Sequence, residues 1–204
     1  MDIEAVMRLG PVIPILVIED AAYAQPIAKA LVAGGLFALE VTLRTPAALA
    51  AIAEMSRVEG AVVGAGTVLN AADLRASSEA GARFMVSPGL TQPLADAAAA
   101  AGVPYLPGVA TAGDIMRGLD LGLNHFKFFP AEAAGGRVAL KSLAAPFFQA
   151  RFCPTGGVSE ANAPDWLATP GVLCVGGSWL VPAGPPDTAA IEARARQTAQ
   201  WARP

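Results

Sequence analysis

Apolar runs and helix-like stretches alternate along the chain, with glycine at the junctions. A stretch with helical spacing ends in glycine and an apolar, β-rich run follows at once. Glycine just past a helix end takes the left-handed conformation that ends the helix at little cost. The intervals between Gly34, Gly60, Gly81, Gly102 and Gly122 are 26, 21, 21 and 20 residues. A strand, a helix and two loops need about that length, so the chain repeats one strand–helix unit.

The pattern predicts eight strands and eight helices. The strands are expected at 12–18, 36–43, 61–66, 83–87, 103–108, 124–129, 149–154 and 172–176. The helices are expected at 21–33, 46–57, 70–80, 91–101, 112–121, 135–145, 160–168 and 187–201; the first of them contains Pro26 and therefore starts late or bends. Continuous apolar strands are typical of a parallel sheet covered by helices.

The predicted fold is α/β, a single-domain (β/α)8 TIM barrel over residues 1–204. Eight strand–helix units without a linker favour closure, although periodicity alone leaves an open doubly wound sheet as an alternative. In such a barrel the active site lies at the carboxyl ends of the strands, so polar residues there are the candidates for chemistry.

Composition narrows the kind of ligand. The chain has 204 residues, 54% hydrophobic, with a net charge of −3 and 14 Lys+Arg, so we expect no nucleic-acid partner. Charged residues and Gly-Pro punctuation break every apolar run early, and the N-terminus is acidic, so we expect no membrane partner or signal peptide. Two cysteines fit a reducing cytoplasm, and one histidine cannot build a His-based metal site, so we expect no metal. We also expect no cofactor.

Lys127 is the most informative candidate. Phenylalanines flank it within a predicted strand, whereas Lys29 and Lys141 lie on helical stretches, where lysines usually face water. A buried ammonium group is costly, and desolvation makes the neutral amine available as a nucleophile for Schiff-base chemistry. A structural lysine paired with a carboxylate is the alternative that its position leaves open.

Glu40, Thr42 and Arg44 lie two residues apart along one strand, so their side chains share a face. Glu40, deep in an apolar run, is a candidate general base or partner of the buried lysine. Arg44 at the strand's end suits a substrate carboxylate. An internal ion pair between Glu40 and Arg44 is the alternative.

Small polar groups follow the other strands. Gly156-Gly157 and Gly176-Gly177-Ser178 come after the last two strands, where barrels often bind phosphate through backbone N–H groups. Thr67 is either a helix cap or a carboxylate donor. We expect His125 to be a packed histidine, and Cys153 and Cys174 to be small hydrophobic residues.

Six strings in order carry a resemblance to a known family. They are LEVTLRT at 39–45, GAGTVL at 64–69, SPG at 87–89, FKFFPAE at 126–132, RFCPTGG at 151–157 and GGSWL at 176–180. The match runs from Val12 to Pro182. The chain strongly resembles the 2-keto-3-deoxy-6-phosphogluconate (KDPG) aldolase family, whose members often also cleave 4-hydroxy-2-oxoglutarate (KHG).

The resemblance implies a class I, metal-independent aldolase on a (β/α)8 barrel, usually a homotrimer, that cleaves a phosphorylated 2-keto-3-deoxy sugar acid of the Entner–Doudoroff pathway. It makes Lys127 the Schiff-base lysine and Glu40 the general acid/base. The substrate-binding residues that it implies are Arg44 and Thr67 for the carboxylate, Pro88 and Phe129 for the pocket wall, Thr155 for the chain hydroxyls, and Gly156, Gly157, Gly177 and Ser178 for the phosphate.

Three other functions remain as alternatives. The first is the aldolase for the galactonate epimer, 2-keto-3-deoxy-6-phosphogalactonate. The Thr155 hydroxyl favours the gluconate substrate over this epimer. The second is a phosphosugar epimerase or isomerase on a similar barrel, although metal-dependent epimerases would want more histidines than His125 alone. The third is a phosphate-binding barrel without catalysis.

Overall fold

Parallel strands and surrounding helices make up the molecule. The computed structural model describes residues 1–201, so the last three residues of the predicted domain lie outside the described residues. The strands are β1 (Val12–Leu16), β2 (Ala38–Thr42), β3 (Val62–Gly66), β4 (Phe84–Val86), β5 (Tyr105–Leu106), β6 (Gly108–Val109), β7 (His125–Phe128), β8 (Arg151–Pro154) and β9 (Val175–Gly177).

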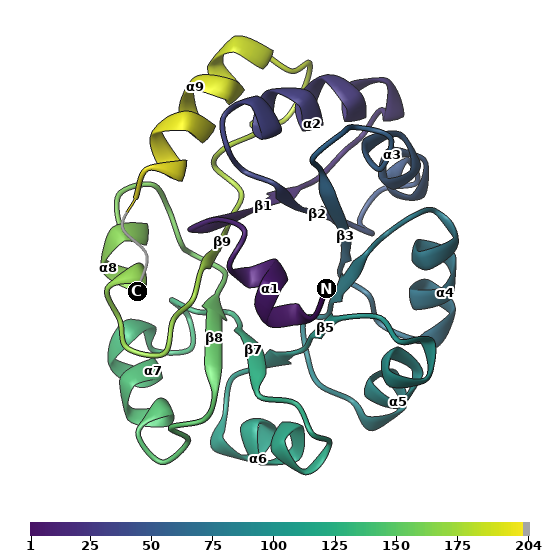
Figure 1. The fold of residues 1–204 in the computed structure, drawn as a ribbon. Coiled ribbons are helices and arrows are strands. Elements are labelled where there is room, and N and C mark those ends of the chain that lie inside the picture. Colours follow the sequence, from purple (N-terminus) through teal and green to yellow (C-terminus); the bar gives the residue numbers. More distant parts are fainter. Residues whose placement is uncertain (202–204) are drawn as a thin grey trace.

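Helices cover the outside of these strands (Figure 1). They are α2 (Ala24–Ala33), α3 (Ala48–Met55), α4 (Ala71–Glu79), α5 (Gln92–Ala101), α6 (Ala112–Asp120), α7 (Gly136–Ala144), α8 (Ala163–Leu167) and α9 (Thr188–Ala199), and a 3₁₀ turn at Ala21–Tyr23 precedes α2. The first predicted helix therefore starts late as an α-helix, which places Pro26 near its beginning, where proline is tolerated.

The strands form a curled parallel sheet that consists of a six-stranded part and a three-stranded part. One part has the order β5-β4-β3-β2-β1-β9 and the other β6-β7-β8. Isolated bridges from Phe152 to Val172 and from Thr155 to Gly176 connect β8 with the region of β9. The pairing register sets Glu40 beside Gly64 and Lys127 beside Cys153. The predicted parallel α/β fold is confirmed at this level.

The core has two layers, because successive strand residues face opposite sides. The larger cluster lies between strands and helices and includes Leu39 and Val41. The smaller cluster lies on the inner side and includes Ala38, Phe84 and Cys174. Both faces of β2 are buried, which explains the continuous apolar runs in the sequence.

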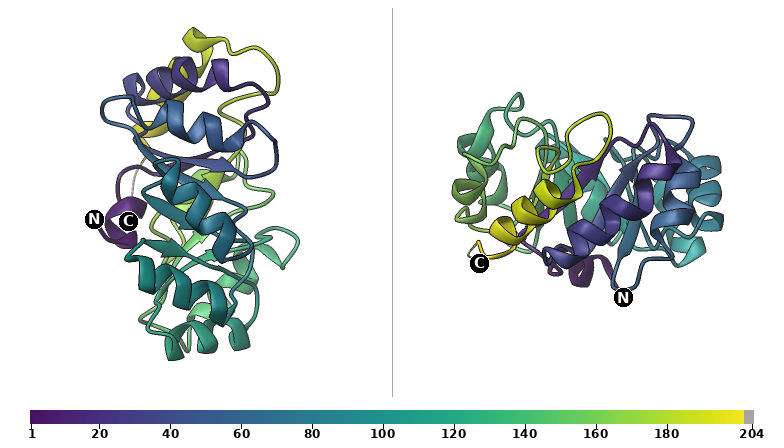
Figure 2. Two further views of the ribbon diagram at one scale, coloured as in Figure 1. Left: turned by 90° about the vertical axis from the view of Figure 1, so that its right-hand side faces the viewer. Right: turned by 90° about the horizontal axis from the view of Figure 1, so that it is seen from above.

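A short helix that the sequence pattern did not predict, α1 (Ile3–Met7), closes one end of the inner layer. Asp2 caps it by accepting a hydrogen bond from the Ala5 N–H at 2.8 Å. Val6 and Met7 are fully buried against the inner cluster. Figure 1 shows α1 over the middle of the ring of strands, and the left view of Figure 2 shows it at one side of the molecule.

Most element boundaries lie within two residues of the sequence prediction, and the main differences are these. The strand expected at 103–108 is split into β5 and β6 at Pro107, which has no N–H for the ladder. The strand expected at 172–176 begins only at Val175, because Val172 makes a single bridge. The first strand ends at Leu16, and α8 is only five residues long. Glycine ends the helices as predicted at Gly102, whereas Gly34 is right-handed and Gly35 takes the positive φ.

Among residues 1–201, no helix is long and apolar enough to cross a membrane.

Candidate active site

Lys127 and Glu40 meet in the interior of the strand ring. The Lys127 Nζ lies 3.2 Å from the Glu40 Oε1, and their side chains are 7% and 4% exposed. They come from β7 and β2, which belong to different parts of the sheet and are not neighbours. The contact therefore depends on the curl of the sheet. The expected burial of Lys127 is observed, and so is its pairing with a carboxylate.

The pair is buried beside an aromatic ring. The Phe129 ring centroid lies 5.4 Å from the Lys127 Nζ, within cation–π range. In a site of low dielectric, a nearby carboxylate interacts strongly with an amine or iminium nitrogen. The arrangement supplies a nucleophile and a proton carrier in direct contact, which covalent catalysis on a carbonyl requires.

Gly66 makes room for the Glu40 carboxylate. A Cβ at position 66 would lie 2.1 Å from the Glu40 Oε1 and 2.6 Å from its Cγ. Similarly, a Cβ at Gly64 would lie 2.4 Å from the Phe84 ring. This role of Gly66 was not predicted from the sequence. The signal was two glycines at period 2 in a strand, which indicates close approach of neighbouring groups.

The other predicted residues follow the carboxyl ends of the strands. Arg44 comes two residues after β2 and is exposed. Within residues 1–201 it has no ion pair with Glu40, so the internal-pair alternative is wrong. Thr42 donates to the Leu16 carbonyl at 3.0 Å and thereby ties the ends of β2 and β1 together.

Thr67 is the one non-glycine residue with positive φ among the described residues, at 61°. It is not a helix cap, because the Asn70 side chain accepts from the Ala72 and Asp73 N–H groups at the start of α4. A threonine held in this conformation costs energy, and such strain concentrates at functional sites. The helix-cap interpretation of Thr67 is therefore wrong, and its contact with a ligand stays a prediction.

Pro88 is exposed at the end of β4, in a loop that is held from two sides. The Ser87 Oγ and Tyr105 Oη are 2.6 Å apart, and Ser87 also donates to the Gly89 carbonyl. Burial raises the pKa of Tyr105 to about 12, so the phenol stays protonated at neutral pH. A Cβ at Gly108 would lie 2.1 Å from the Pro88 carbonyl oxygen, so the loop packs directly on β6.

The predicted phosphate residues lie at the ends of β8 and β9. Thr155 is buried and Gly156 and Gly157 have φ of 95° and 79°, which glycine tolerates. Gly177 ends β9 and Ser178 is exposed after it. The isolated bridge between Thr155 and Gly176 brings these two strand ends side by side.

His125 and the cysteines are packed as expected. His125 is buried near the opposite end of β7, with Nε2 3.5 Å from the Glu4 Oε2. Burial lowers the pKa of His125 despite the Glu4 carboxylate. A hydrogen bond with Cys153 and burial raise the pKa of Cys174, which keeps this thiol unreactive. No group of three His, Cys, Asp or Glu side chains that could hold a metal occurs in the described part of the chain.

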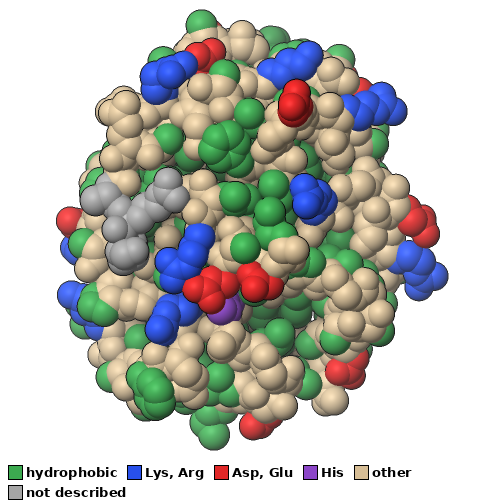
Figure 3. Space-filling view, viewed as in Figure 1, with side chains coloured by type: hydrophobic (Ala, Val, Ile, Leu, Met, Phe, Trp, Pro, Cys, Tyr) green, Lys and Arg blue, Asp and Glu red, His purple; other side chains and the backbone are tan. Residues whose placement is uncertain are grey.

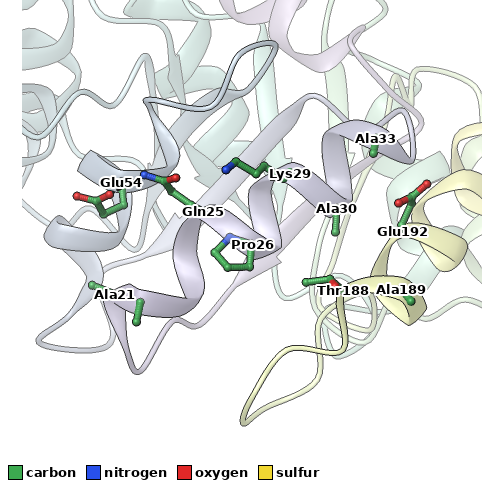
Figure 4. Close-up of a pocket in the computed structure, with 11 residues that line it drawn as sticks. Ala21, Gln25, Pro26, Lys29, Ala30, Ala33, Glu54, Thr188, Ala189 and Glu192 are labelled. Atoms are coloured by element: carbon green, nitrogen blue, oxygen red, sulfur yellow. Dashed lines mark hydrogen bonds between the residues drawn. The ribbon is translucent and has the colours of Figure 1, made fainter.

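A large groove lies elsewhere, on the outer faces of α2, α3 and α9. It encloses about 960 Å³ and is lined by Lys29, Gln25, Glu54 and Glu192 among others (Figure 4). Gln25 donates to Glu54 at 2.8 Å, and Lys29 is exposed. None of the predicted site residues lines this groove. Lys141 is also exposed, so of the three lysines only Lys127 is buried.

Comparisons with known proteins identify a family whose model matches most of this chain. The family model described as KDPG and KHG aldolase matches residues 3–194. A 2-dehydro-3-deoxy-phosphogluconate aldolase of Zymomonas mobilis is 62% identical, over 99% of this chain and 97% of that protein. A KHG/KDPG aldolase of Escherichia coli is 55% identical over 88% of this chain and 85% of that protein.

A solved structure adds chemical detail. The crystal structure of KDPG aldolase from Legionella pneumophila is 42% identical, with a TM-score of 0.95, covering 98% of this chain and 99% of that one. In that structure, pyruvate was captured at low pH as a covalent carbinolamine intermediate.

Proposed function

The chain belongs to the KDPG and KHG aldolase family, and from this we propose that it cleaves KDPG to pyruvate and glyceraldehyde 3-phosphate. It is a carbon–carbon lyase of the class I type, which works through a Schiff base. The observation that carries the proposal is the buried contact of 3.2 Å between Lys127 and Glu40. The carbinolamine described for the Legionella enzyme is the first covalent intermediate of this chemistry.

Lys127 is the nucleophile of the proposed mechanism. Its neutral amine attacks the C2 ketone and gives a carbinolamine, which loses water to form a protonated imine. When the C3–C4 bond breaks, its electron pair moves to the imine nitrogen and an enamine is left. The aldehyde leaves, the enamine is protonated at C3, and water releases pyruvate and the free amine.

Glu40 carries the protons. It shuttles a proton during carbinolamine dehydration, and it takes the proton of the C4 hydroxyl as the C3–C4 bond breaks. Its carboxylate contacts the Lys127 amine, so the same group can transfer protons both at C2 and at the C4 hydroxyl. Because Gly66 has no Cβ, this carboxylate has room to lie beside it.

The strand ends bind the rest of the substrate in this proposal. Arg44 and Thr67 hold the carboxylate, which orients C2 toward Lys127. Pro88 and Phe129 form the pocket wall, and Thr155 bonds a chain hydroxyl. The phosphate lies against the turn at Gly156 and Gly157 and the end of β9 at Gly177 and Ser178.

We further propose that the two parts of the sheet form one closed (β/α)8 barrel and one domain over residues 1–204. The bridges between β8 and β9 and the short step across Pro107 between β5 and β6 support closure. A cytoplasmic homotrimer is the expected assembly. Two buried free thiols agree with a reducing compartment.

Substrate choice is tested by following pyruvate release from KDPG, from its galactonate epimer and from KHG. We expect kcat/KM for KDPG to exceed that for the epimer by at least about tenfold, because Thr155 offers a hydroxyl contact. KHG, which lacks the phosphate, is expected to be a slower second substrate. Preference for the epimer would assign the galactonate function, and no pyruvate from any of them would overturn the proposal.

A further inference from the structure

Glu132 is a charged residue that the proposed mechanism does not use, yet it has several defined partners. Its Oε1 accepts hydrogen bonds from the Trp166 Nε1 at 2.9 Å and from the Asn162 Nδ2 at 3.2 Å. Trp166 is fully buried on α8, so its N–H has a partner only because Glu132 reaches it. Hydrogen bonds to a carboxylate are stronger than neutral ones.

The same network holds the turn after β8. The Asn162 Nδ2 also donates to the Gly157 carbonyl at 3.1 Å, and the Asn162 Oδ1 accepts from the Ser159 N–H at 2.8 Å. The backbone adds a second connection, because the Glu132 N–H donates to the Gly156 carbonyl at 3.0 Å. Glu132 therefore contacts this turn through both its side chain and its backbone.

Gly157 packs directly on the Glu132 side chain. A Cβ at position 157 would lie 2.6 Å from the Glu132 Cγ and 2.7 Å from its Cβ. The Gly157 φ of 79° already disfavours any other residue, and the Glu132 stem leaves no space for a side chain. The position of the Gly157 backbone is thus set by the position of Glu132.

We propose that Glu132 is a positioning residue for the distal, phosphate-bearing end of the substrate. It acts through Gly157 and does not itself touch substrate. It lies four residues beyond the end of β7, so one short segment connects the Lys127 strand to the turn at Gly156 and Gly157. This inference rests on the proposed function, and it makes Glu132 a determinant of the preference for phosphorylated over unphosphorylated keto acids.

The test compares Glu132→Ala with the wild type on KDPG and on KHG. We expect KM for KDPG to rise about tenfold, because a charge-assisted contact is lost. With KHG, kcat/KM should stay within about twofold of the wild type, since no phosphate has to be held. Glu132→Gln keeps an acceptor for Trp166 and Asn162, and should restore KM for KDPG to within about fivefold of wild type.

Two further variants separate this role from a general structural one. Glu160→Ala removes an exposed carboxylate from the same loop and should leave the kinetic constants for both substrates unchanged. Trp166→Phe removes the N–H donor together with part of the buried ring, and it should lower the KDPG/KHG ratio of kcat/KM in the same direction, which keeps the test valid if Glu132→Ala does not fold. An equal loss on both substrates, or an unchanged ratio in the variants that fold, would overturn the inference. Failure of the wild type on both would instead overturn the proposed function.

Discussion

Strand β7 places two basic side chains on one face, and each lies near a carboxylate. His125 lies 3.5 Å from Glu4, and Lys127, two residues further along, lies 3.2 Å from Glu40. The two contacts have similar lengths and quite different surroundings. The Glu4 side chain is 45% exposed and also pairs with Arg8, whereas the Glu40 side chain is 4% exposed.

The difference indicates that the two ends of β7 have different roles. The His125 end contributes to stability, and the Lys127 end contributes to the chemistry. Glu4 sits on α1, at the end of the ring where acidic and basic side chains gather at the surface (Figure 3). Water screens such charges, so ion pairs between them contribute little to the free energy of unfolding. The Lys127–Glu40 pair is buried beside the Phe129 ring and lies toward the strand ends that carry the other polar candidates. Conservative changes at the two ends should therefore have separable effects.

The largest expected effect comes from Lys127→Ala. Loss of the amine removes the covalent route, so kcat/KM for KDPG should fall by more than about 10⁴-fold. Lys29→Ala is the matched control, because Lys29 is an exposed lysine in the groove of Figure 4. Steady-state pyruvate release measures both. Substantial activity in Lys127→Ala, or its loss in Lys29→Ala, would contradict the assignment.

Glu40→Gln should have the next largest effect. It keeps the shape of the side chain and removes the base, so turnover should fall by roughly 10²–10⁴-fold. Glu54→Gln, which alters a carboxylate bonded to Gln25 and Arg57, should stay within about twofold of the wild type. Turnover of Glu40→Gln near the wild-type rate would remove Glu40 from the mechanism.

Met7→Ala tests the other end of the strand ring. Met7 is fully buried in the inner cluster, and truncating a buried methionine costs about 2–5 kcal/mol of unfolding free energy. Chemical denaturation should show this loss while kcat stays within about twofold of the wild type. Met116→Ala, at an exposed position on α6, is the control and should leave stability unchanged. A fall in kcat without a loss of stability would mean that α1 belongs to the active site.

The smallest effect concerns pH and His125. Burial lowers the folded-state pKa of His125 below its unfolded value of about 6.5, so the unfolded chain binds more protons just below that pH. The contribution of His125 to the free energy of unfolding is therefore fully present above about pH 6.5. It declines as the pH falls toward the folded-state pKa of His125. The neighbouring charges are Glu4, Asp2, Arg151 and Arg8; the hydrogen bond from Arg8 lowers the pKa of Glu4, so Glu4 stays ionised in this range.

His125→Gln cannot titrate, so it should reduce this dependence. We expect its Tm to fall less than that of the wild type between about pH 7.5 and about pH 5.5. Thermal unfolding followed by circular dichroism at both pH values measures the difference. Equal slopes in the two proteins would show that His125 contributes nothing to the pH dependence.

Residue types in short stretches of the sequence predicted most of the helices and strands, and they identified Lys127 and Glu40 as candidates. Glycine punctuation separates helices from strands because it acts within a few residues. Lys127 and Glu40 stand out because charged residues rarely occur inside apolar strands. Their direct contact was one of the options that the sequence left open, because 87 residues separate them and only the curl of the sheet brings them together.

The features that the sequence analysis missed depend on tertiary contacts. Helix α1 has five residues, too few for a periodic pattern, and it is stabilised by burying Val6 and Met7. The role of Glu132 depends on Asn162 and Trp166, which are about thirty residues away. No spacing rule connects these positions, so their network could be found only from the structure.

The most direct test of the central claim is trapping of the covalent intermediate. The protein is incubated with pyruvate and sodium borohydride, which reduces the imine to a stable amine, and the modified peptide is identified by mass spectrometry. We predict one reduced pyruvyl adduct, on Lys127. An unmodified protein, or an adduct only on Lys29 or Lys141, would contradict the assignment of Lys127 as the Schiff-base lysine.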